Sequence, residues 1–191
     1  MVTALIDPAI AVQPPALPTV EQVWDWLAEV EDPEIPVISI VDLGIVRDVA
    51  FDGAACMVTI TPTYSGCPAT EVIAQSIMQA LQARGLNDVR LKTRIAPAWT
   101  TDWISEDGRR KLRGYGIAPP MGSAAEQTIR PDQIGRGAPR QRSPLDVPIG
   151  LACPHCGSQK VRLTSPFGST PCKALARCDD CLEPFDYFKC H

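Results

Sequence analysis

The chain has 191 residues, enough for one ordinary domain and a small additional module. Hydrophobic residues make up 45% and charged residues 21% of it, as in soluble globular proteins, and no apolar stretch approaches the roughly 20 residues that span a bilayer. The formal net charge is −4 and the isoelectric point about 5.2, so neither a membrane nor a nucleic acid is an expected partner.

Residues 1–18 are expected to be a disordered leader. They lack the basic start of a signal peptide, and prolines interrupt their apolar residues. Without an export signal, the expected location is the reducing cytoplasm, where the eight cysteines would not form disulfides. Six of these eight cysteines lie after residue 150. Thiols concentrated in this way indicate metal binding.

Residues 19–115 are predicted to form a small α+β domain with the element order α-β-β-α-β-α. A capping box at Thr19 and Gln22 begins the first helix, which is expected to end near Asp32 and Pro33. The later elements are two strands at 45–51 and 55–61, a helix at 68–84, a strand at 88–96 and a helix at 102–113. This order predicts a sheet of three to four strands with helices on one face.

Two later features interrupt the regular pattern. Gly108 lies inside the last predicted helix and costs about 1 kcal/mol relative to alanine, which weakens that prediction. Residues 116–150 are rich in proline, glycine and arginine and have few periodic apolar positions. We therefore expect a linker there.

Residues 151–191 are predicted to form a zinc ribbon, because two C-x-x-C pairs are separated by 21 residues, slightly more than the usual 15–20. Such pairs can complete the tetrahedral shell of a structural zinc ion, which would supply on the order of 10 kcal/mol of folding free energy. The expected ligands are Cys153, Cys156, Cys178 and Cys181. Cys172 or Cys190 could replace one of them. A redox dithiol is the alternative, but neither pair has the βαβ setting of that class.

The aromatic residues near the end of the chain could in principle form a base-stacking platform for nucleic acid. Phe185, Tyr187 and Phe188 alternate partly as in a strand, and the nearby basic and acidic residues nearly balance. We therefore expect these three side chains to form the small core of the ribbon itself.

Cys67 is the second candidate site. Pro68 suits the first helical position, which places Cys67 at the N-cap, where free amides and the helix dipole would lower the pKa of its thiol. Such a cysteine is a nucleophile, a soft-metal ligand or simply a small buried residue, and the residues alone do not decide. Asp32, Glu34 and Asp42 lie in loops that could approach it, although a solvated role is the alternative for each. No histidine precedes residue 150, which disfavours a cysteine–histidine hydrolase.

Several strings resemble known families. Three strings in the first domain resemble the iron–sulfur assembly domain of SufT-like proteins. They are Asp-Pro-Glu-Ile-Pro at 32–36, Val-Asp-Leu-Gly at 41–44 and Thr-Pro-Thr-Tyr-Ser-Gly-Cys-Pro-Ala-Thr at 61–70. Further strings resemble the D subunit of the bacterial phenylacetyl-CoA 1,2-epoxidase system, at 97–103, 167–170, 172–175 and 183–190.

This resemblance implies an accessory role in phenylacetate breakdown, in which a non-enzymatic protein matures or protects an iron–sulfur or di-iron centre. The implied partners are the oxygenase and reductase subunits, and the implied cargo is a transient iron ion or iron–sulfur cluster. Cys67 matches the cysteine of the family's Gly-Cys-Pro turn, which favours metal handling, and Asp32 and Glu34 belong to a matching loop. A structural or regulatory subunit of the oxygenase is the alternative, and homodimerisation is left open.

Overall fold

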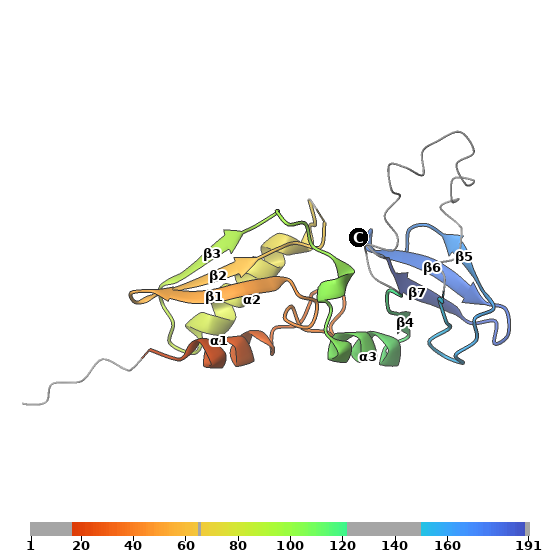
Figure 1. Ribbon diagram of the computed structural model, residues 1–191, viewed down its shortest axis with the longest axis horizontal. Coiled ribbons are helices and arrows are strands. Elements are labelled where there is room, and N and C mark those ends of the chain that lie inside the picture. The colour runs from red at the N-terminus through yellow and green to blue at the C-terminus, as the bar shows by residue number, and fades with distance from the viewer. Residues whose placement is uncertain (1–16, 65, 122–149, 190–191) are drawn as a thin grey trace, which may run out of the picture.

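The protein consists of two small sheets arranged end to end, as a computed structural model shows for residues 17–64, 66–121 and 150–189 (Figure 1). Nearly all of the predicted leader and most of the predicted linker, 122–149, lie outside these described residues. Among the described residues, we find no helix with the length and apolar character required to cross a membrane.

The first sheet has the strand order β1-β2-β3. Its strands are β1 (Val46–Asp52), β2 (Ala55–Ile60) and β3 (Val89–Thr93). The first two strands form an antiparallel hairpin, as predicted, whereas β2 and β3 run parallel. A parallel pair requires a crossover, and α2 (Ala69–Gln82) supplies it.

The first helix, α1 (Val20–Leu27), begins at the predicted capping box. The Thr19 hydroxyl accepts a hydrogen bond from the Gln22 amide, and the Gln22 side chain accepts one from the Thr19 amide. The helix ends at Leu27 and not near Asp32, so the predicted end was wrong. The reason is a local backbone pairing, in which the Val30 carbonyl accepts from the Ile40 amide at 3.0 Å.

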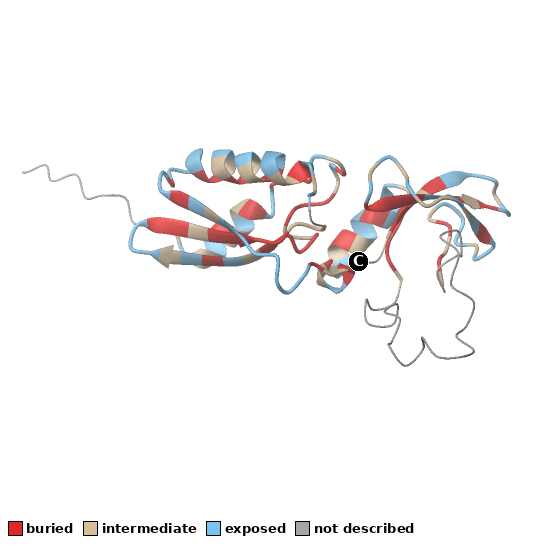
Figure 2. Ribbon diagram, turned by 90° about the horizontal axis from the view of Figure 1, so that it is seen from above, coloured by how far each residue is buried: buried red, intermediate tan, exposed pale blue. Residues whose placement is uncertain are grey.

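The helices α1 and α2 pack on one face of the first sheet, as predicted (Figure 2). The buried side chains of α1 and α2 meet those of the central strand in one core, whose innermost members include Val23, Leu27, Ile73, Ile77, Val58 and Ile60. The opposite face of the sheet is exposed at Asp48, Arg90 and Lys92. Burial therefore alternates along parts of the edge strands β1 and β3, whereas five of the six residues of the central strand β2 are buried.

The last predicted helix of this domain is divided in two. A short 3₁₀ helix, η1 (Thr101–Trp103), precedes α3 (Glu106–Gly114), because the Ser105 hydroxyl caps α3 by accepting from the Gly108 amide at 2.9 Å. The predicted single helix at 102–113 was thus wrong in its first turn. Gly108 lies where a Cβ atom would be 2.9 Å from Ile38 Cδ1 and 3.1 Å from the Asp42 carbonyl oxygen, so close packing accounts for this glycine.

The second sheet has the strand order β4-β7-β6-β5. Its strands are β4 (Ile117–Ala118), β5 (Val161–Ser165), β6 (Lys173–Cys178) and β7 (Pro184–Phe188). The first of them directly follows α3 and pairs in parallel with β7. The beginning of the expected linker is therefore an edge strand of the ribbon sheet.

The two sheets also share part of their cores. Phe185 and Tyr187 pack within the ribbon, as predicted, but Phe188 belongs to the core of the first domain. Its ring lies 6.1 Å from that of Trp99, centroid to centroid. The expectation that all three aromatic residues serve the ribbon was wrong for Phe188, because the end of β7 borders the first domain.

Candidate metal centres

The four predicted zinc ligands converge in the ribbon. Their Sγ atoms all lie within 4.8 Å of one another. Two of the separations are 3.7 Å, between Cys153 and Cys181, and 3.6 Å, between Cys156 and Cys178. Four sulfurs about 2.3 Å from a tetrahedral zinc ion would be roughly 3.8 Å apart. The donor set and its spacing therefore fit one zinc ion with no open position.

Local backbone geometry prepares these thiols for a cation. The Cys181 amide points at the Cys178 sulfur, 3.5 Å away, and is the main cause that lowers the pKa of Cys178 to about 7. A backbone hydrogen bond at Glu183 also favours the Cys181 thiolate, but burial and the three neighbouring thiols outweigh it and raise the pKa of Cys181 to about 12. Four such sulfurs cannot all be anionic without a bound cation.

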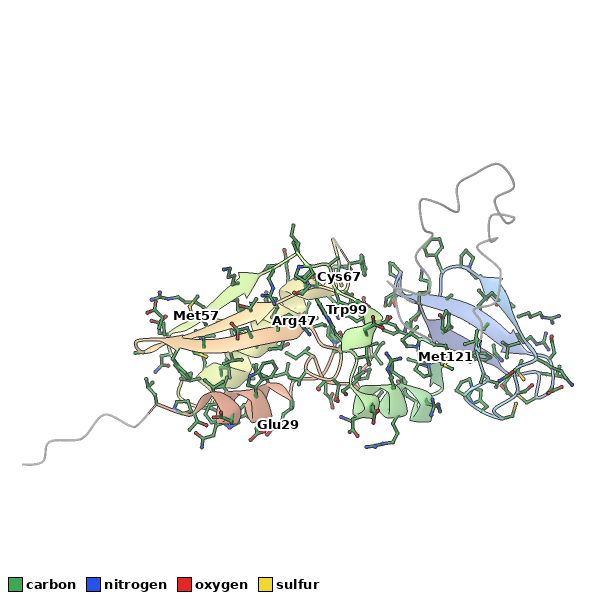
Figure 3. The ribbon with its side chains drawn as sticks, viewed as in Figure 1. Glu29, Arg47, Met57, Cys67, Trp99 and Met121 are labelled. Atoms are coloured by element: carbon green, nitrogen blue, oxygen red, sulfur yellow. The ribbon has the colours of Figure 1, made fainter. Side chains whose placement is uncertain are left out.

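A second group of potential ligands lies where the two domains meet. We call this hollow the interdomain pocket. Its polar lining consists of Asp32, Glu34, Thr63, Cys67, Thr70 and Cys172, and its apolar lining includes Ile35, Leu43, Ile45, Ile60, Ile73 and Phe188. Figure 3 shows Cys67 at the end of the first domain that faces the ribbon sheet. The structure thus brings the three residues predicted for iron handling into one pocket.

The two carboxylates reach the pocket from the loop after α1. Asp32 is 7% exposed, and its Oδ1 atom accepts hydrogen bonds from the amides of Glu34 and Ile35, both at 2.9 Å. Burial nevertheless raises the pKa of Asp32. Burial, and then the charge of Asp32, also raise the pKa of Glu34. Both carboxylates would therefore gain from a nearby cation.

Cys67 stands just outside α2. The regular helix begins at Ala69 with Pro68 before it, but the φ of −65° and ψ of −25° at Pro68 are helical, as expected for the predicted first helical position. Its amide donates to the Tyr64 carbonyl at 3.2 Å, and its carbonyl accepts from the Thr70 amide at 3.1 Å. These bonds fix the backbone on both sides of the thiol.

Sequence reasoning missed two residues, one that interacts with the lining of this pocket and one that belongs to the lining. The first is Tyr64, whose hydroxyl is buried and has no partner of normal hydrogen-bond geometry among the described residues. Burial first, and then the proximity of Cys67, Glu34 and Cys172, raise its pKa to about 12. Its presence in the string that contains Cys67 was the only available signal.

The second missed residue is Cys172, which the sequence suggests only as a substitute zinc ligand. It is 5% exposed and lies directly before β6, where its Sγ is 3.0 Å from Thr170 Oγ1 and 4.0 Å from Glu34 Oε2. Burial raises the pKa of its thiol. The neighbouring Lys173 is also buried, with its Nζ atom 3.5 Å from Asp186 Oδ2. Its positive charge acts against burial and offsets part of the rise in the pKa of Asp32 and Glu34.

Two further candidates lie elsewhere. Cys56 is fully buried at the second position of β2. Asp42 instead accepts hydrogen bonds from Ser105 Oγ and Lys111 Nζ, both at 2.6 Å, and these bonds lower its pKa although burial acts in the opposite direction. Asp42 therefore anchors α3 and does not line the interdomain pocket.

Comparison with known proteins identifies the family. A protein of Escherichia coli (strain K12), provisionally named as the D subunit of 1,2-phenylacetyl-CoA epoxidase, is 45% identical over 175 residues, which are 92% of this chain and 95% of that protein. The chain belongs to this D-subunit family. Family models match its two parts, as an iron–sulfur cluster assembly protein at 20–90 and as a PaaD zinc β-ribbon domain at 138–189.

Further relatives match about half of this chain. A protein of Porphyromonas gingivalis (strain ATCC BAA-308 / W83), named an Fe-S protein maturation auxiliary factor, is 35% identical over 50% of this chain and 92% of its own length. A solved structure from Bacillus anthracis, described as domain of unknown function DUF59, is 27% identical, covers 48% of this chain and 89% of that chain, and has a TM-score of 0.45.

Proposed function

We propose that this protein is a non-enzymatic accessory factor of a phenylacetyl-CoA epoxidase system, acting in the cytoplasm to mature or protect an iron–sulfur or di-iron centre. In this proposal Cys67 is the thiolate that contacts iron, and the oxygenase and reductase subunits are the partners. The observation that carries the proposal is the convergence of Cys67, Asp32 and Glu34 in one pocket. Membership of the D-subunit family supports the choice of system.

The chemistry of the pocket suits transient iron binding. Iron accepts both soft thiolate ligands and hard carboxylate ligands. Asp32 and Glu34 are held in a partly desolvated loop, so an arriving cation would relieve the cost of their charges. The pocket opens to solvent beside Cys67 and Glu34, which are both partly exposed, and a cargo ion could enter and leave there.

The ribbon has a different role in this proposal. Its four sulfurs form a closed shell, and a closed zinc shell stabilises a fold without taking part in chemistry. The zinc would hold β5, β6 and β7 together and so keep Phe188 against Trp99 at the edge of the pocket. We therefore assign zinc a structural function and iron the role of cargo.

The test replaces the native gene, in a bacterium that grows on phenylacetate through the epoxidase, with wild type, Cys67→Ser or the control Cys56→Ser. Growth is measured, and the oxygenase and reductase are purified anaerobically for iron and sulfide analysis. We expect Cys67→Ser to lower the metal content of one of them at least fivefold, with Cys56→Ser close to wild type. Full metal content with Cys67→Ser would contradict the proposal and favour a structural subunit.

A further inference from the structure

The position of Cys172 calls for an explanation beyond the ribbon fold. The zinc shell is complete without it, because the four clustered thiols are Cys153, Cys156, Cys178 and Cys181. Its side chain turns away from that cluster and packs in the core of the first domain. A thiol that belongs to the ribbon in sequence thus lines the pocket of the other domain.

One distance within the pocket is close to that between two ligands of the same metal ion. Cys172 Sγ and Glu34 Oε2 are 4.0 Å apart, close to the roughly 3.6 Å that separates a sulfur and an oxygen ligand of one tetrahedral ion. After burial, the proximity of Cys67, Glu34 and Cys172 raises the pKa of the Tyr64 hydroxyl, so all three side chains lie near it. This buried hydroxyl has no partner of normal hydrogen-bond geometry in the described part of the chain.

We infer that Cys67 and Cys172 together bind the cargo ion, a thiophilic divalent metal such as Fe(II), with the Glu34 carboxylate as a third ligand. The site therefore spans both domains, and the ribbon contributes a ligand besides stabilising the structure. Each thiol releases its proton to solvent as its sulfur binds the metal, so two protons leave for each ion bound. This inference rests on the proposed function, whose Cys67 it retains.

A site divided between domains gives the ribbon a direct effect on iron. Cys172 is positioned by the start of β6, and β6 ends at the zinc ligand Cys178. A zinc ion held by the four clustered thiols would therefore fix the strand that presents the second thiol. Lys173, adjacent and buried, offsets part of the negative charge of two thiolates and a carboxylate.

The test titrates Co(II), a spectroscopic substitute for Fe(II), into the anaerobic, reduced, zinc-loaded full-length protein. Sulfur-to-cobalt charge-transfer absorption reports the number of thiolate ligands, because carboxylates contribute none. We expect Cys172→Ala to halve this absorption and to weaken binding at least tenfold. Glu34→Gln should keep the absorption and weaken binding several-fold. Cys56→Ala, which removes a buried thiol elsewhere, should behave as wild type. Zinc content and melting temperature verify folding, and Cys172→Ser replaces Cys172→Ala if the latter does not fold.

The outcomes separate the two proposals. Wild-type absorption and affinity in Cys172→Ala, with both lost in Cys67→Ala, would overturn the two-thiol site and leave the proposed role of Cys67 intact. Unchanged binding in both variants would overturn both. Wild-type protein that takes up no Co(II) beyond its zinc would overturn the two-thiol site, and the growth and metal-content test would still decide the proposed function.

Discussion

Gly44 offers a quantitative test of how the pocket wall is built. Its φ is +68°, and a Cβ atom placed on it would lie 2.6 Å from both Cβ and the carbonyl oxygen of Trp103. The neighbouring Leu43 and Ile45 line the interdomain pocket, and the Leu43 carbonyl accepts a 2.9 Å hydrogen bond from Trp99 Nε1. Close contact between two backbone segments therefore shapes this side of the pocket.

The expected cost of Gly44→Ala has two parts. A left-handed conformation at a residue other than glycine costs about 1–2 kcal/mol. Forcing a methyl group against the Trp103 backbone adds about 1–3 kcal/mol of overpacking. The matched control is Gly53→Ala, because Gly53 has a similar φ of +61° in the β1–β2 turn but nothing within 4 Å of the position that its new methyl group would take. The control should therefore show only the conformational cost.

The assay is urea unfolding of both variants and wild type, followed by tryptophan fluorescence and far-UV circular dichroism. We expect Gly44→Ala to lose about 2–5 kcal/mol of unfolding free energy, and Gly53→Ala about 1–2 kcal/mol. Since 1 kcal/mol shifts the melting temperature of such a domain by about 4–8 °C, thermal melts should separate the variants as well. Equal losses in the two variants would refute the claim that Trp103 leaves no room at Gly44.

Three further predictions concern charge and metal. Asp32→Asn keeps the oxygen that accepts two backbone hydrogen bonds but removes a buried charge. The unfolding free energy at pH 7 should therefore stay equal or rise by up to about 1 kcal/mol, while iron binding falls. A clear loss of stability would contradict this prediction. The pKa of Asp42 lies below its ordinary value of 3.8, so its charge stabilises the fold above the unfolded-state pKa, and this stabilisation is lost as pH falls through the folded-state pKa. The roughly 1 kcal/mol advantage of wild type over Asp42→Asn should therefore shrink as acid melts are taken below pH 3.8, and an advantage that grows in acid would contradict this. Cys153→Ala should lose the zinc and unfold the ribbon, while the first domain keeps its helices as measured by circular dichroism. The first domain should become about 2 kcal/mol less stable, because Phe188 leaves its core. Unchanged zinc content would contradict the ligand assignment.

Much of the fold could be predicted because local signals decide it. The capping box at Thr19, the hairpin turn after β1 and the periodic apolar residues of α2 are all read from neighbouring positions. The two C-x-x-C pairs likewise predicted four ligands that the structure brings together, because each pair is held by one tight turn.

The parts that were missed depend on contacts distant in sequence. The end of α1 is set by pairing with the loop around Ile40, and the break before α3 is set by Ser105. Cys172 reaches Glu34 across 138 positions, which no spacing rule covers. Phe188 alternates correctly for a strand, but the identity of the core that it enters depends on how the two domains pack.

Iron binding by the Cys67 thiolate in the interdomain pocket is the central property to test. Zinc-loaded wild type and Cys67→Ser are incubated anaerobically with Fe(II) and sulfide, desalted, and analysed for iron, sulfide and zinc. We expect wild type to retain iron and the variant to lose at least nine-tenths of it, with about one zinc per chain in both. Equal iron in the two proteins, at equal zinc content, would contradict the account.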